Sequence, residues 1–191
     1  MASEIIAFIR QLTGSTELEV GELIAISTHK AFEPKACLVK AGQIPNEFGF
    51  VVDGLFRYVY LSEEGKEFTK VFMPAGSFIS SYSAMISKSL SYFSVEAIES
   101  SEVLVVPYDR WQKLREQNPA WNILLLKLLE KGYAAKEKRE REFLLLDAES
   151  RYKSFLKDYP TLEQRVKQYM VASYLGITPI ALSRVRKKMN A

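Results

Sequence analysis

Four glycines recur at nearly even spacings of 12, 11 and 11 residues in the first half of the chain: Gly42, Gly54, Gly65 and Gly76. Between them lie runs rich in aromatic and β-branched residues, at 48–52, 55–61 and 68–73. Glycine readily adopts the positive φ angle that tight turns need. The pattern therefore predicts short antiparallel strands joined by turns, which form a compact barrel or roll. Two further runs, 93–98 and 103–106, extend the barrel.

Helical patterns precede and follow this barrel. Residues 3–30 carry apolar side chains at helical spacing, with a break at 14–16. After the barrel, 108–117 predicts a short helix, and Asn118-Pro119 combines an N-cap residue with proline at the first helical position.

A long helix is expected next, because no proline occurs between Ala120 and Tyr159. From Ala120 to about residue 146 it would measure about 40 Å. Asp147 is a suitable N-cap for a further helix, so a hinge is expected at 144–147.

The first half of this helix is apolar on most of its sides and must be covered on most sides. One side can rest on the barrel and another on the same helix of a second copy. The expected dimerisation seam follows alternating spacings of 3, 4 and 3, at Leu125, Leu128, Gly132 and Ala135. The alternative is a helix buried within its own monomer.

Much catalytic and metal chemistry is excluded because the chain has one cysteine, Cys37, and one histidine, His29. No internal disulfide and no Cys/His metal cage can form, so neither an enzyme nor a metal site is expected. The N-terminus lacks the pattern of a signal peptide, and no apolar run is long enough for a membrane span. A cytoplasmic protein without membrane partners is therefore expected.

The net charge of +3 is distributed unevenly. Residues 146–191 contain nine basic and four acidic residues, which makes this end +5 and the remainder −2. A basic C-terminal region suggests a polyanionic partner. A solvated helix face is the alternative explanation.

Residues 168–187 match the helix-turn-helix pattern. Gly176 stands where the turn needs a left-handed residue, Thr178 can cap the second helix, and Pro179 suits its first position. Apolar residues at the spacing of two crossing helices complete the match: Val171, Leu175, Ile177, Leu182 and Val185. A helical hairpin without DNA-binding function is the alternative.

The second helix of the motif presents the candidate DNA-reading side chains. Arg184 can donate two hydrogen bonds to guanine, and Ile180 can contact a thymine methyl group. Other side chains could contact bases or the phosphate backbone. The full candidate set is Thr178, Ile180, Ser183, Arg184, Lys187, Lys167, Gln168, Arg186 and Lys188.

From about residue 18 to 190 the chain resembles the cyclic-AMP receptor/fumarate-nitrate regulator (Crp/Fnr) superfamily. The resemblance rests on Ala41-Gly42, 51–54, 65–67, 74–79 and 172–179. It implies an α+β fold with a jelly-roll-like double-stranded β-helix as sensor, a long dimerisation helix and a winged-helix-like C-terminal helix-turn-helix. The corresponding domains are 1–117, 118–146 and 147–191.

This resemblance also implies a homodimer that binds a two-fold symmetric operator in double-stranded DNA and regulates transcription. A small-molecule effector and RNA polymerase are further candidate partners, and no cofactor is indicated. Other functions left open are a cyclic-nucleotide-binding-like signalling module that does not read DNA, and a metal-dependent β-barrel enzyme.

The sensor departs from the family at its nucleotide-binding residues. Members that bind cyclic nucleotides carry a glutamate where this chain has Ser81, and an Arg-Ser or Arg-Thr pair where it has Ser91-Tyr92. Without the arginine, the cyclic phosphate loses a charge-assisted pair worth about 1.5–3 kcal/mol. An effector bound in another manner is therefore expected, with Ser80, Ser81, Ser91 and Tyr92 as pocket candidates.

Overall fold

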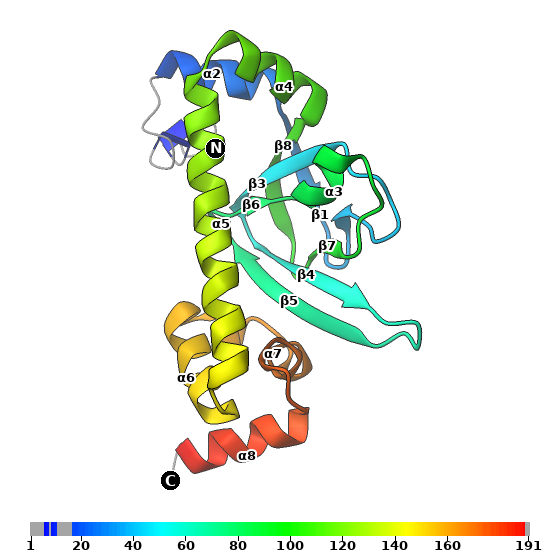
Figure 1. The fold of residues 1–191 in the computed structure, drawn as a ribbon, viewed down its shortest axis with the longest axis vertical. Helices are drawn as coiled ribbons and strands as arrows, with labels where there is room; N and C mark the ends of the chain where they lie inside the picture. The colour runs from blue at the N-terminus through cyan, green and yellow to red at the C-terminus, as the bar shows by residue number, and fades with distance from the viewer. Residues whose placement is uncertain (1–5, 8, 11–16, 190–191) are drawn as a thin grey trace.

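The computed structural model describes residues 6–7, 9–10 and 17–189. A β-barrel lies beside one long helix, and the last three helices gather at the lower end of that helix (Figure 1). The elements in chain order are α2 (Glu17–Ile26), β1 (Thr28–Phe32), β2 (Cys37–Val39), β3 (Glu47–Asp53), β4 (Leu55–Leu61), β5 (Glu67–Pro74), β6 (Phe78–Ile79), α3 (Tyr82–Ser87), β7 (Ser94–Ala97), β8 (Ser101–Pro107), α4 (Tyr108–Gln117), α5 (Ala120–Leu145), α6 (Ala148–Asp158), the 3-10 helix η1 (Leu162–Gln164), α7 (Gln168–Leu175) and α8 (Pro179–Met189).

Two four-stranded antiparallel sheets make up the barrel. Their strand orders are β1-β8-β3-β6 and β2-β7-β4-β5. The four evenly spaced glycines all have positive φ, between 78° and 98°, as their turn positions require. The predicted β-roll is thereby confirmed.

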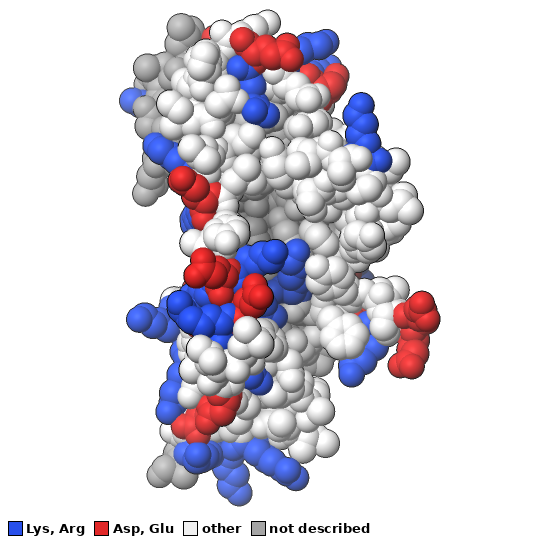
Figure 2. All heavy atoms as spheres, in the orientation of Figure 1, with Lys and Arg blue, Asp and Glu red and all other residues white. Residues whose placement is uncertain are grey.

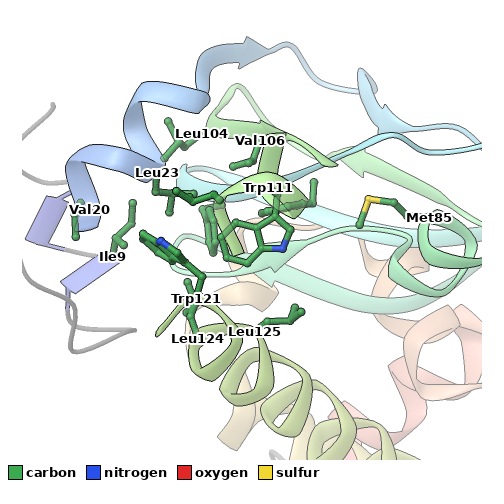
Figure 3. Close-up of a cluster of buried hydrophobic side chains, with 13 residues drawn as sticks. Ile9, Val20, Leu23, Met85, Leu104, Val106, Trp111, Trp121, Leu124 and Leu125 are labelled. Atoms are coloured by element: carbon green, nitrogen blue, oxygen red, sulfur yellow. The ribbon is translucent and has the colours of Figure 1, made fainter. Parts of the chain in front are cut away.

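Among the described residues, three hydrophobic clusters make up the core. One fills the barrel between its sheets. A second joins α2, α4 and the start of α5 to the strands β3 and β8, with the rings of Trp111 and Trp121 in edge-to-face contact at 5.7 Å (Figure 3). The third connects the C-terminal helices with Leu55 and Phe72 of the barrel. The C-terminal helices therefore share a core with the sensor.

Most predicted elements are present, but the N-terminal helical prediction extends too far. Residues 28–30 belong to β1, whose main chain pairs with β8 over 70 residues later in the chain. Residues 3–5, 8 and 11–16 of that prediction lie outside the described residues. The short strands β2 and β6 were not predicted, because three and two residues carry too little periodicity.

The long helix ends one residue before its predicted limit, at Leu145. Leu146 is extended, and the Asp147 side chain accepts a hydrogen bond from the Ser150 N–H at 2.8 Å, which is the predicted N-cap. Residues 108–189 contain helices and loops but no β-strand. The likeness to a winged-helix domain is therefore limited to its helices.

The turn between α7 and α8 has the geometry that the helix-turn-helix pattern predicts. Gly176 has a φ of +69°, and the N–H of Ile177 donates to the Ala172 carbonyl at 3.0 Å. The Thr178 hydroxyl then accepts from the Ala181 N–H at 3.1 Å and caps α8. A Cβ on Gly176 would lie 2.6 Å from Cε1 of Phe143 in α5. Any other residue at this turn would strain the backbone at positive φ and force the Phe143 ring to move.

We expect Gly176→Ala to lower the free energy of unfolding by about 1–3 kcal/mol, because it combines strained backbone with a ring contact. Gly21→Ala is the matched control: Gly21 lies within α2, and among the described residues beyond its own helix an added Cβ would meet open space. This control should raise the stability by about 0.5–1 kcal/mol. Urea denaturation monitored by circular dichroism measures both. Equal stability of the two variants would contradict this role for Gly176.

Candidate nucleic-acid interface and sensor site

The second helix of the motif exposes a polar and basic face at the lower end of the molecule. Leu182 points inward and is fully buried, whereas Ile180 is 68% exposed and Ser183, Arg184 and Lys187 are also exposed. Lys and Arg side chains gather at this end, where α8 lies (Figures 1 and 2). The four predicted groove-facing residues therefore share one solvent-facing side of α8.

The remaining basic residues of α8 are bound to acidic side chains. Arg186 forms an ion pair with Glu163 and donates to the Tyr152 hydroxyl at 3.1 Å. Lys188 forms an ion pair of 2.7 Å with Glu149 at the start of α6. These contacts hold α8 against its own domain, a role that sequence reasoning missed because the acids lie 23 and 39 residues away.

By contrast, within residues 17–189 neither Arg184 nor Lys187 has a salt-bridge partner. Lys167 is exposed at the N-cap position of α7. The Gln168 side chain lies 3.4 Å from the Ser183 hydroxyl and from the Pro179 carbonyl, and thus connects the two helices. The basic residues of α8 thus fall into two groups: exposed cations without a salt bridge, and paired cations that hold the helix in position.

An aromatic clamp, made by Arg139, Phe143 and Arg151, fastens the long helix to the end of α7. The two guanidinium carbons lie 4.7 and 5.0 Å from the centre of the Phe143 ring. Arg139 donates to the Tyr174 carbonyl at 2.8 Å, and Arg151 to the Leu175 carbonyl at 3.1 Å. Cationic groups at a helix C-terminus donate hydrogen bonds to carbonyls that lack an intrahelical partner. They are also attracted by the negative end of the helix dipole. The motif is therefore held by α5.

Helix α7 also contacts the edge of the barrel. The Ser173 hydroxyl accepts from the Thr69 N–H at 2.8 Å and lies 3.3 Å from the Glu67 carbonyl, so it covers main-chain groups of the outermost strand β5. The rings of Phe72 and Tyr174 are 5.5 Å apart in the shared core. Because α7 touches both α5 and β5, a shift of either element would move the motif.

The predicted pocket residues of the sensor divide into two groups. Ser80, Ser81 and Ser91 come together and are buried, and the hydroxyls of Ser81 and Ser91 form a hydrogen bond of 2.8 Å. The Ser80 hydroxyl is buried without a partner among the described residues. Tyr92 does not join them, since it is 85% exposed. The three serines offer neutral hydroxyl groups and no positive charge for a phosphate.

A tyrosine that sequence reasoning missed closes this cluster. The Tyr58 hydroxyl accepts from the Ser80 N–H at 2.8 Å, and its ring stacks on Phe93 at 4.9 Å. Burial raises the pKa of Tyr58, so the phenol stays neutral. Apolar and aromatic residues at 56, 58 and 60 could have indicated that Tyr58 faces inward. Its neighbours in the fold, however, depend on the pairing of β4 with β7, which the sequence does not show.

The four residues of the predicted dimerisation seam divide into a buried pair and an exposed pair along α5. Leu125 is only 7% exposed and belongs to the core with Trp121, and Leu128 packs against the same core. Gly132 and Ala135 are exposed further along the helix. The large apolar side chains exposed on α5 are Ile123, Leu126, Leu129 and Tyr133, with Phe143, Leu144 and Leu145 near its end.

The single histidine and the single cysteine, whose scarcity argued against catalysis, have ordinary surroundings. His29 lies 3.3 Å from Glu102 across the β1–β8 pair, and Cys37 is partly buried, which raises the pKa of its thiol. Among the described residues, no three His, Cys, Asp or Glu side chains gather as metal ligands. None of the helices in the described ranges is both long and apolar enough to cross a bilayer.

Comparisons with known proteins agree with this architecture. Residues 29–118 match the cyclic nucleotide-binding domain family. The c-di-GMP-responsive global regulator CLP of Xanthomonas campestris has a similar structure, with a TM-score of 0.76, 16% identity and 92% of each chain covered. FixK2 of Bradyrhizobium japonicum gives 0.75 and 16%, covering 86% of this chain and 85% of FixK2.

A Crp/Fnr-family regulator from Eubacterium rectale is also similar, with a TM-score of 0.72, 12% identity, and 96% of this chain and 88% of the other covered. No curated protein matches the chain in sequence. Residues 29–118 therefore match the cyclic nucleotide-binding domain family, and over about nine-tenths of its length the chain has the fold seen in Crp/Fnr family regulators.

Proposed function

We propose that the chain is a sequence-specific DNA-binding transcription regulator that acts as a homodimer and responds to an effector through its β-roll. The observation that carries the proposal is the exposed, unpaired face of α8 around Arg184, on a helix-turn-helix that the chain holds firmly. The fold shared with Crp/Fnr regulators over about nine-tenths of the chain supports it. The domains remain those predicted from the sequence: 1–117, 118–146 and 147–191.

In this proposal the candidate DNA residues have different roles. Arg184 reads a base edge, with Ser183, Lys187 and Ile180 beside it in the major groove. Lys167 contacts phosphate. Thr178, Gln168, Arg186 and Lys188 orient α8 through their contacts within the domain. Because an ion pair reduces a cation's availability to phosphate, Arg186 and Lys188 contribute less to affinity than their charge implies.

The homodimer is proposed to form through the free face of α5, defined by Leu126, Leu129 and Tyr133. These residues follow spacings of 3 and 4, as a two-stranded seam requires. Leu126 is 55% exposed and Tyr133 69% exposed. The proposed seam is displaced by one residue from the seam expected from the sequence, because Leu125 and Leu128 pack into the core of their own chain.

An effector can act only if its affinity for the protein differs between two positions of the helix-turn-helix. The contacts that would transmit such a difference are the Ser173 hydrogen bonds to β5 and the aromatic clamp to α5. RNA polymerase stays a predicted partner.

Arg184→Ala should weaken binding to the cognate operator by about 30-fold or more, because each of the two subunits loses a bidentate base contact worth about 1–3 kcal/mol. Arg110→Ala is the matched control, since Arg110 is exposed on α4 at the opposite end of the molecule. Selection of genomic fragments by the wild-type protein identifies the operator, expected as a palindrome with half-sites about 34 Å apart. Fluorescence anisotropy then measures both variants. Equal losses in the two variants, or no enriched palindrome, would argue against sequence reading.

Leu126→Glu should raise the dimer dissociation constant about 100-fold or more, because two carboxylates enter one apolar seam. Ile44→Glu, an equally exposed position on the barrel, should leave the dimer intact. Leu125→Ala tests the alternative seam: we expect it to lower monomer stability through a core cavity while dimerisation persists. Sedimentation equilibrium measures all three variants. A dimer that survives Leu126→Glu would contradict the seam.

A further inference from the structure

A cavity lies among the C-terminal helices, between α6, α8 and the segment 163–168 that connects η1 to α7. Its volume is about 430 Å³, within the range of about 300–1,000 Å³ that is typical of small-molecule sites. Leu156, Val166 and Met189 form its apolar side, and all three pack against the C-terminal core. The four groove-facing residues of α8 do not line it. The cavity is therefore distinct from the side of α8 that carries Arg184.

The polar side of the cavity is a pair of opposite charges joined by a phenol. The Glu163 carboxylate forms an ion pair with Arg186 and also accepts a hydrogen bond from the Tyr152 hydroxyl. The same hydroxyl accepts from Nε of Arg186 at 3.1 Å. Gln168 completes this side of the cavity. These side chains come from α6, η1, α7 and α8, so the site exists only when all four elements are packed together.

This polar side keeps both an acceptor and a donor for a ligand. Among the described residues, the contacts of Glu163 use Oε1, so Oε2 can still accept a hydrogen bond. The contacts of Arg186 use Nε and Nη2, so the N–H groups of Nη1 can still donate. The two charges offset each other, and an added anion would be repelled by Glu163 as it is attracted by Arg186. A carboxamide meets these conditions, because it carries a donor and an acceptor side by side without a net charge.

We infer that this cavity binds a small neutral carboxamide, with its apolar body against the three apolar side chains and its amide against Glu163 and Arg186. The bound molecule contacts Gln168 and Arg186, the residues that orient α8, and so acts on the position of the helix-turn-helix directly. The site differs from the serine cluster of the β-roll in both place and chemistry. The inference does not rest on the proposed DNA function, because binding is measured without DNA.

An NMR titration of the ¹⁵N-labelled full chain with 4-isopropylbenzamide as the probe tests the site. We expect saturable binding of one molecule per chain with a dissociation constant of about 1 mM or lower. The shifted amide signals should belong to residues around 152–168 and 186–189. The comparison compound of the same shape is 4-isopropylbenzoate, which should bind about tenfold more weakly or less because Glu163 repels its carboxylate.

Glu163→Gln should reverse this preference, because the guanidinium of Arg186 then lacks its counter-charge. We expect this variant to bind the benzoate about tenfold more tightly than the wild-type protein does. Glu149→Gln is the matched control: Glu149 pairs with Lys188 of the same helix but does not line the cavity. This control should change both affinities by less than about twofold.

Val166→Trp provides a second test that leaves the ion pair in place. The larger side chain fills the cavity, so it should weaken benzamide binding about tenfold or more. Circular dichroism checks that each variant keeps its helices. Absence of saturable benzamide binding to the wild-type protein would overturn the site, as would benzoate binding as tightly as benzamide. Equal responses of Glu163→Gln and Glu149→Gln, or full binding to a folded Val166→Trp variant, would also overturn it.

Discussion

The edge-to-face contact between Trp111 and Trp121 fixes the orientation of the long helix against the barrel. The positions of the remaining elements depend on that orientation. Both indoles are almost fully buried where α4, α5 and the barrel meet. Such rings contribute a large apolar area and a specific geometry. Once this end of α5 is anchored, each later side chain points in a direction decided by helical rotation. The free apolar face and the position of Phe143 both follow from it.

The C-terminal helices are fastened to the sensor at two places with different chemistry. Cation–π contacts and charge-assisted hydrogen bonds join α5 to the end of α7. An apolar core and a serine hydroxyl join α7 to β5. Sensor and helix-turn-helix are thus in physical contact without a long pathway between them.

Local signals in the sequence were sufficient for most of the fold. The glycine spacing, the start at Asn118-Pro119 and the cap at Asp147 all act within a few residues, and the structure confirms each of them. The turn at Gly176 is local in the same sense. The strand at 28–30 was mistaken for helix because its hydrogen-bond partner, β8, lies far along the chain. A propensity argument cannot include such a partner.

The candidate site shows the same division. The sequence alone determined that α8 is basic, amphipathic and capped at its N-terminus, because these properties depend on the spacing and type of residues. Only the tertiary structure decided which cations are paired, since Glu163 and Glu149 reach Arg186 and Lys188 from other elements. Likewise, helical periodicity established that α5 has several apolar sides, but the packing of the barrel decided which side stays exposed. The physical reason is that periodicity describes one element, whereas burial and charge pairing require its neighbours.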